Sequence, residues 1–129
     1  MSNQIKVNVA AFGHKMPNKI AISNTAPDGI RTLQQIIKEL GRHDIFKLLI
    51  PDKDDWLSYK NGSMSWNEFQ RHYVIRVRYL NLPKIMGKLC RYLLVDEITL
   101  CCYEAAGDEH CHRKILYDML PEEIRGVRK

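Results

Sequence analysis

One segment, residues 98–116, most constrains the fold, because it joins a strand pattern to a helix pattern through a short loop. The run Ile98-Thr99-Leu100-Cys101-Cys102-Tyr103 is apolar and β-prone, and it ends at the carboxylate of Glu104. A glycine-containing loop follows, and Cys111-His112-Arg113 then opens an apolar helical pattern. In α/β domains, ligands bind where the carboxyl end of a strand faces a helix N-terminus, whose free N–H groups favour anions. The segment therefore predicts both a fold class and the position of a site.

The same alternation of strand and helix patterns continues through the rest of the chain. Ile5, Val7 and Val9 alternate with polar residues, which predicts a first strand, and residues 19–23 predict a short second one. Apolar residues at helical spacing predict helices over residues 33–40, 66–80, 83–93 and 113–120, with a helical turn over 52–58. Residues 43–50 fit either helix or strand, and Ser65 with Glu68 forms a capping box. This order predicts a small three-layer α/β fold with a mostly parallel sheet.

Length and composition predict one domain spanning residues 1–129, with a basic C-terminal tail from about residue 122. A chain of 129 residues with 45% hydrophobic content is the size of an ordinary globular domain. The apolar runs fall short of the roughly 18 residues that a membrane span needs, and no signal sequence opens the chain. We therefore expect a cytoplasmic protein with no membrane partner, in which the four cysteines are reduced.

The charge is basic, with 20 Lys and Arg against 15 Asp and Glu and a net charge of +5. A positive chain attracts phosphorylated or polyanionic partners, including DNA and RNA. Six of these residues lie in two neighbouring segments: Arg71, Arg76, Arg78, Lys84, Lys88 and Arg91. These residues could form a nucleic-acid-binding surface, or they could simply be the solvent-exposed face of a helix.

Several motifs resemble one known family. They are Cys102-Tyr103-Glu104 with Cys111-His112-Arg113, together with Tyr59-Lys60-x-Gly62 and Trp66-x-Glu68-Phe69-x-x-x-Tyr73. This set resembles the family of domain of unknown function 488, and the resemblance covers nearly the whole chain. It implies a compact α/β domain with a site around Glu104 and the Cys-His-Arg element, and a link to nucleotide or nucleic-acid metabolism. The chain departs from the family at Cys101, where an aliphatic residue is common.

Three residues carry the predicted chemistry of the site. Glu104, at the end of a buried strand, suits a general base or a nucleophile. Arg113 suits a bidentate contact to phosphate, and His112 suits proton transfer. A purely structural ion pair between Glu104 and Arg113 remains an equal alternative.

Four further residues are candidate ligand contacts. Cys102 shares one side of the strand with Glu104, and Cys111 lies near a helix N-terminus, where its thiol could be activated or simply packed. His14 follows the first strand, so a parallel sheet brings it to the same edge, and Lys60 belongs to the resembling Tyr-Lys-Gly element.

Three functions are open at this point. The first is a nucleotide- or nucleic-acid-directed protein, with an N-glycosidic or related base-processing reaction as its most specific form. The second is a non-catalytic protein that binds a phosphorylated small molecule or a nucleic acid. The third, a zinc-stabilised interaction module, ranks below both, because no Cys-x-x-Cys pair exists and adjacent Cys111 and His112 cannot easily hold one ion. We expect no metal and no cofactor.

Overall fold

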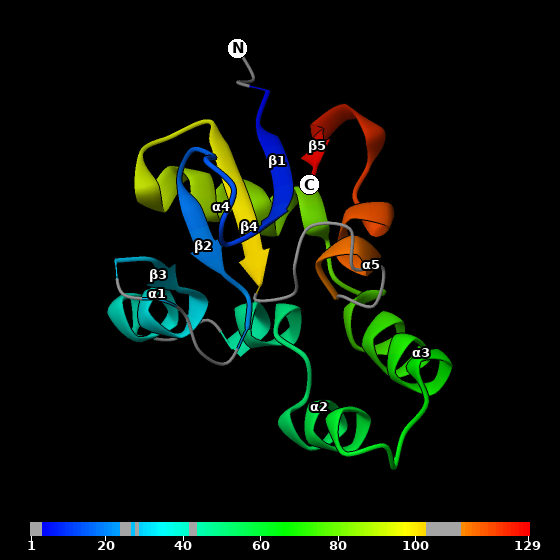
Figure 1. Ribbon diagram of the computed structural model, residues 1–129. Coiled ribbons are helices and arrows are strands. Elements are labelled where there is room, and N and C mark those ends of the chain that lie inside the picture. The colour runs from blue at the N-terminus through cyan, green and yellow to red at the C-terminus, as the bar shows by residue number, and fades with distance from the viewer. Residues whose placement is uncertain (1–3, 24–26, 28, 42–43, 103–111) are drawn as a thin grey trace.

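The computed structural model describes residues 4–23, 27, 29–41, 44–102 and 112–129, and these form a parallel sheet with helices packed on it (Figure 1). The strands are β1 (Lys6–Ala11), β2 (Lys19–Ala21), β3 (Arg31–Thr32), β4 (Glu97–Cys102) and β5 (Arg125–Arg128). Within the described residues they make one five-stranded sheet in the order β3-β2-β4-β1-β5. All pairings are parallel. The predicted α/β class with a parallel sheet is confirmed.

The helices follow the predicted segments closely. They are α1 (Leu33–Leu40), α2 (Lys53–Lys60), α3 (Trp66–Val77), α4 (Leu82–Leu93) and α5 (His112–Met119), with short 3-10 helices η1 (Asp44–Leu49) and η2 (Glu122–Ile124). Within the ambiguous segment 43–50, residues 44–49 are thus 3-10 helix. Among the described residues, no helix combines the length and apolar character needed to cross a membrane.

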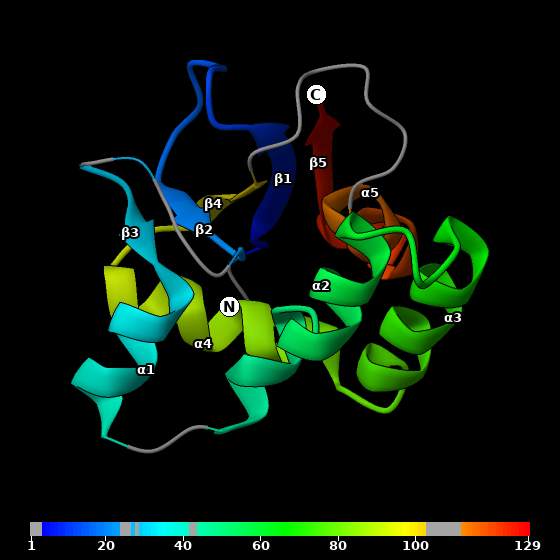
Figure 2. The same ribbon diagram turned by 60° about the horizontal axis from the view of Figure 1, so that its bottom comes forward.

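One face of the sheet holds the apolar core. Successive strand residues point to opposite faces, so Val7 and Val9 share this face with Ile98 and Leu100, all of them fully buried. The helices contribute buried residues to the same cluster: Leu33, Ile36, Met86, Leu89 and Leu116. Figure 2 shows α1 and α4 together on one side of the strands. Burying each such side chain stabilises the fold by about 2 kcal/mol.

The other face of the sheet is more polar, and the segment 12–18 lies against it. Asn8 and Thr99 are buried there side by side. The Asn8 amide donates to a Glu97 carboxylate oxygen at 2.8 Å, and the Thr99 hydroxyl donates to the Pro17 carbonyl at 2.7 Å. An irregular segment, held by side-chain hydrogen bonds, thus covers part of the face that a helix would cover in a larger α/β domain.

The C-terminal residues form an edge strand, so the prediction of a basic tail from about residue 122 is wrong. β5 pairs with β1, and the backbone N–H of Val127 donates to Asn8 Oδ1 at 2.8 Å. A Cβ atom on Gly126 would lie 1.9 Å from the same oxygen, so only glycine fits this position. The basic composition of residues 125–128 did not indicate a strand. The pairing of this strand with β1 depends on the buried Asn8, which is distant in sequence.

Local capping matches the sequence in part. Ser65 caps α3 by accepting the Glu68 backbone N–H at 3.1 Å, as predicted. Glu68 reaches the Ser65 hydroxyl, at 3.4 Å, rather than its backbone N–H, so the predicted capping box is half formed. A complete box lies instead at the start of α1, between Thr32 and Gln35.

Candidate functional site

The carboxyl ends of the two central strands define the candidate site. β1 and β4 end level with each other, since Ala11 pairs with Cys102, and β2 lies on the other side of β4. α5 begins beside this edge with His112 and Arg113, and both side chains are buried. The structure therefore brings Cys102, His112 and Arg113 together. Glu104 and Cys111 lie outside the described residues.

Arg113 places a permanent positive charge in the interior. Its side chain is fully buried, and Nη1 donates to Cys102 Sγ at 3.2 Å. A guanidinium does not lose its proton in a protein, and burying a charge is costly unless an anion lies close to it. The position therefore favours a carboxylate or a phosphate in its immediate surroundings.

His112 is held in one tautomer. Its Nε2 lies 2.9 Å from the Ile22 carbonyl oxygen just after β2, so Nε2 must carry the proton and donate it. The Nδ1 atom then keeps its lone pair, and it is buried with no hydrogen-bond partner among the described residues. Burial, together with the charge of Arg113, lowers the pKa of His112 to about 4, against the opposing effect of the Ile22 hydrogen bond. At neutral pH the ring is uncharged, and Nδ1 is an acceptor.

Tyr73 on α3 supports this imidazole, a role the sequence did not indicate. Its ring packs edge-on to the ring of His112, with centroids 5.5 Å apart. The phenol is buried, donates to the Leu49 carbonyl at 2.5 Å, and has a raised pKa because of its burial. The apolar stripe of α3 predicted Tyr73 as core, and only the packing of α3 on α5 adds the contact with His112.

The cysteines differ from the prediction that all are reduced. Cys102 is disulfide-bonded, so the prediction is wrong for this residue. Cys90 and Cys101 are free and buried. Burial raises the pKa of the Cys101 thiol to about 11, which makes it a poor nucleophile at neutral pH. The lack of a secretion pattern predicts reduced thiols, but it does not decide which thiols the fold brings together.

Two other predicted ligand residues, His14 and Lys60, contact residues outside this cluster. His14 follows β1 in a turn, in which its N–H donates to the Ala11 carbonyl at 3.2 Å. It therefore lies near the same sheet edge. Lys60 ends α2 with its ammonium 4.4 Å from the ring centroid of Trp56. Within the described residues, Lys60 has no hydrogen bond or ion pair with His112 or Arg113, so its role as a ligand contact stays a prediction.

A metal ion would need several ligand side chains that lie close together. Among the residues that the structure describes, no three His, Cys, Asp or Glu side chains lie close enough together to hold an ion. Cys111, one of the residues considered for zinc, is outside that part of the chain.

Comparison with known proteins identifies one family. The sequence model described as the active DUF488-N3 subclade matches residues 12–124, a range that includes every predicted site residue. Neither the curated proteins nor the solved structures gave a match. The comparisons therefore give a family but no named substrate.

Proposed function

Because the chain belongs to the active DUF488-N3 subclade of the domain of unknown function 488 family, we propose that it acts on a nucleotide or a nucleic acid at the carboxyl edge of its sheet. The most specific form of the proposal is hydrolysis of the N-glycosidic bond between base and sugar. One observation carries it: a neutral imidazole with a fixed tautomer is followed directly in α5 by a buried, permanently charged guanidinium, whose charge acts on the imidazole. That pair combines a proton acceptor with an anion-binding group.

Each residue has a defined part in this chemistry. Arg113 holds a phosphate oxygen, since a guanidinium binds phosphate through two parallel N–H groups. Glu104 takes a proton from water as the water oxygen forms a bond to the anomeric carbon. The carbon–nitrogen bond breaks, its electron pair goes to the base, and the proton taken from water ends on that base. His112 accepts a hydrogen bond or proton at Nδ1, because Nε2–H is committed to Ile22.

The first test is native mass spectrometry of the purified protein for co-purified nucleotides, followed by incubation with nucleoside 5′-monophosphates and chromatography of the released bases. We expect binding of at least one nucleotide and release of its base. Arg113→Lys should weaken binding more than tenfold, because Lys lacks the two-pronged contact. Glu104→Gln should stop base release while leaving binding within a few-fold of wild type. Absence of both binding and base release would refute the proposal.

A second function, binding of a phosphorylated small molecule without turnover, is favoured by one observation. His112 is only 2% exposed and Arg113 is fully buried. A site that only binds a ligand can be buried more completely than an active site, which must admit water and release products. Tight nucleotide binding with no base release, unchanged by Glu104→Gln, would support this alternative over the enzyme.

A further inference from the structure

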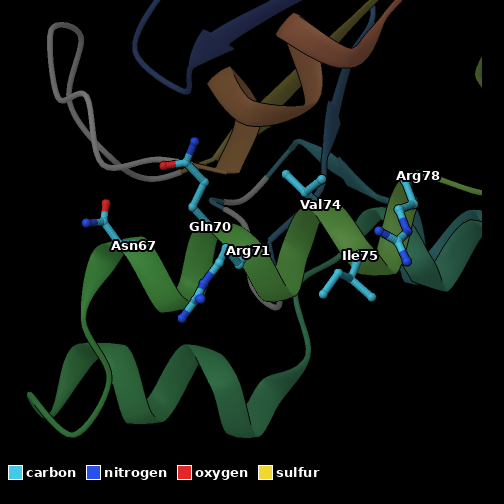
Figure 3. A pocket seen from close by; sticks show the side chains of 6 residues that line it. All are labelled: Asn67, Gln70, Arg71, Val74, Ile75 and Arg78. Carbon is cyan, nitrogen blue, oxygen red and sulfur yellow. The ribbon is translucent and has the colours of Figure 1, made fainter.

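A hollow along α3 is lined by residues other than those of the site described above. Its volume is about 790 Å³, and it is lined by Asn67, Gln70, Arg71, Val74, Ile75 and Arg78 (Figure 3). All six residues belong to α3 or its C-cap, on the side away from its buried residues Phe69, Tyr73 and Val77. The hollow therefore follows one helix and is open to solvent along its length.

Two arginines give the hollow a positive charge. Arg71 and Arg78 are exposed and lie two helical turns apart, about 10 Å along the axis. Neither forms an ion pair with any acidic residue that the structure describes. Arg76 on the same helix differs, because its guanidinium donates to the carbonyls of Ile50 and Lys47 at 2.8 and 3.2 Å. The six basic residues of the sequence cluster thus do not act alike, and Arg71 and Arg78 are available to an anionic partner.

The hollow also has an aromatic neighbour. Tyr79 is 81% exposed, and the Arg78 guanidinium lies 4.7 Å from its ring centroid. Ile75, 53% exposed, adds an apolar surface, and the amides of Asn67 and Gln70 can donate and accept hydrogen bonds. Basic groups beside an exposed aromatic ring suit single-stranded nucleic acid, whose phosphates need charge and whose bases need a stacking surface. An acidic peptide would use the charge alone.

The hollow adjoins the candidate site through α3. Gln70 and Val74 lie within one turn of Tyr73, whose ring packs on His112. Figure 3 shows Gln70 and Val74 pointing toward α5, and α3 packs on α5. A strand that lies along α3 therefore passes beside the start of α5.

We propose that single-stranded DNA or RNA docks in this hollow, with its phosphates on Arg71 and Arg78 and a base stacked on Tyr79. This inference specifies a polymer as the substrate of the proposed function. It depends on the proposed function for the reaction at α5, but not for the binding along α3.

The test measures fluorescence anisotropy of labelled thymidine and uridine strands of about twelve nucleotides at several salt concentrations. The double variant R71Q/R78Q should weaken binding more than tenfold and reduce the slope of log affinity against log salt by about 1.4, since each single-strand phosphate contact contributes about 0.7. Tyr79→Ser should weaken binding about tenfold at constant slope. Arg91 on α4 is an exposed arginine that lines a different hollow. Arg91→Gln removes one positive charge, so it is the control for the single variants Arg71→Gln and Arg78→Gln, and it should stay within twofold of wild type.

Three results would overturn the inference. The first is that no strand binds at low salt. The second is that Arg91→Gln weakens strand binding as much as the α3 variants do. The third is that polyglutamate displaces the labelled strand as effectively as unlabelled strand does. Nucleotide assays on the same proteins separate the two proposals. If nucleotides bind and are processed but strands do not bind, only the docking inference fails. If strands bind through α3 but neither strands nor nucleotides are processed or held at α5, only the proposed function fails.

Discussion

The start of α5 and the outer face of α3 both present arginine, yet they use its charge in different ways. Arg113 is fully buried beside a disulfide-bonded cysteine, whereas Arg71 and Arg78 stand in solvent. In the interior, a low dielectric strengthens each charge interaction and fixes it to particular atoms, whereas in solvent salt screens the same charge within about 10 Å. The first arrangement suits recognition of one group, and the second suits attraction of a polymer.

The largest expected difference between the two regions is in stability. Arg113→Ala should lower the free energy of unfolding by about 4 kcal/mol, because it empties the volume of a large buried side chain. Arg71→Ala should change it by less than about 0.5 kcal/mol, as is usual for a surface residue. Urea denaturation of both variants measures this. Equal effects would mean that the two arginines do not differ in burial.

The second difference appears in acid. His112 has a pKa of about 4 when folded against 6.5 for the free side chain. Between these values the unfolded chain binds a proton that the folded chain does not, so the free energy of unfolding falls as the pH drops from 6.5 to 4, by about 3 kcal/mol in all. His112→Gln, which keeps a donor near Ile22, should remove this loss. Urea denaturation at pH 7 and pH 4.5 measures it.

His72 provides the matched control for that measurement. Its imidazole is on α3, exposed, and 3.2 Å from the Asp55 carboxylate. His72→Gln should alter the difference between the two pH values by less than about 1 kcal/mol, since exposed ion pairs contribute little. A wild-type acid sensitivity that survives His112→Gln would show that another group is responsible.

A smaller effect is expected for the two tyrosines. Tyr73→Phe should cost about 1 kcal/mol, because the buried Leu49 carbonyl loses its donor. Tyr79→Phe should cost less than about 0.5 kcal/mol, since its hydroxyl only accepts from Arg78 in solvent. Thermal unfolding of the two variants decides this. A Tyr79→Phe loss that matched the Tyr73→Phe loss would show that the Tyr79 hydroxyl is not in solvent.

The smallest effect on stability belongs to Ile75, on the exposed face. Ile75→Ser should change the free energy of unfolding by less than about 0.5 kcal/mol, since the side chain is already 53% exposed. The same change should weaken strand binding several-fold, because it removes part of the apolar surface of the hollow. Unchanged anisotropy with this variant would remove Ile75 from the docking surface.

Local patterns were enough to predict most elements. Alternation at Val7 and Val9, and helical spacing from Leu33 to Leu40, reflect contacts between near neighbours in sequence, and the structure has β1 and α1 at these places. The order of strands and helices likewise predicted a parallel sheet, because parallel strands need crossover connections. The meeting of Cys102 with Arg113 is part of the predicted cluster, since a strand that leads into a helix through one short loop must bring their ends together.

Long-range contacts decided the rest. Asn8 accepts the Val127 N–H across 119 residues, and this turns an expected tail into β5. Tyr73 packs on His112, and the Ile22 carbonyl fixes the tautomer of that imidazole, across 90 residues. The spacing of apolar residues in the sequence follows the period of each helix or strand, and so it predicts which face of that element is apolar. The properties of the site depend on which buried polar atoms meet, and distant segments meet only in the folded chain.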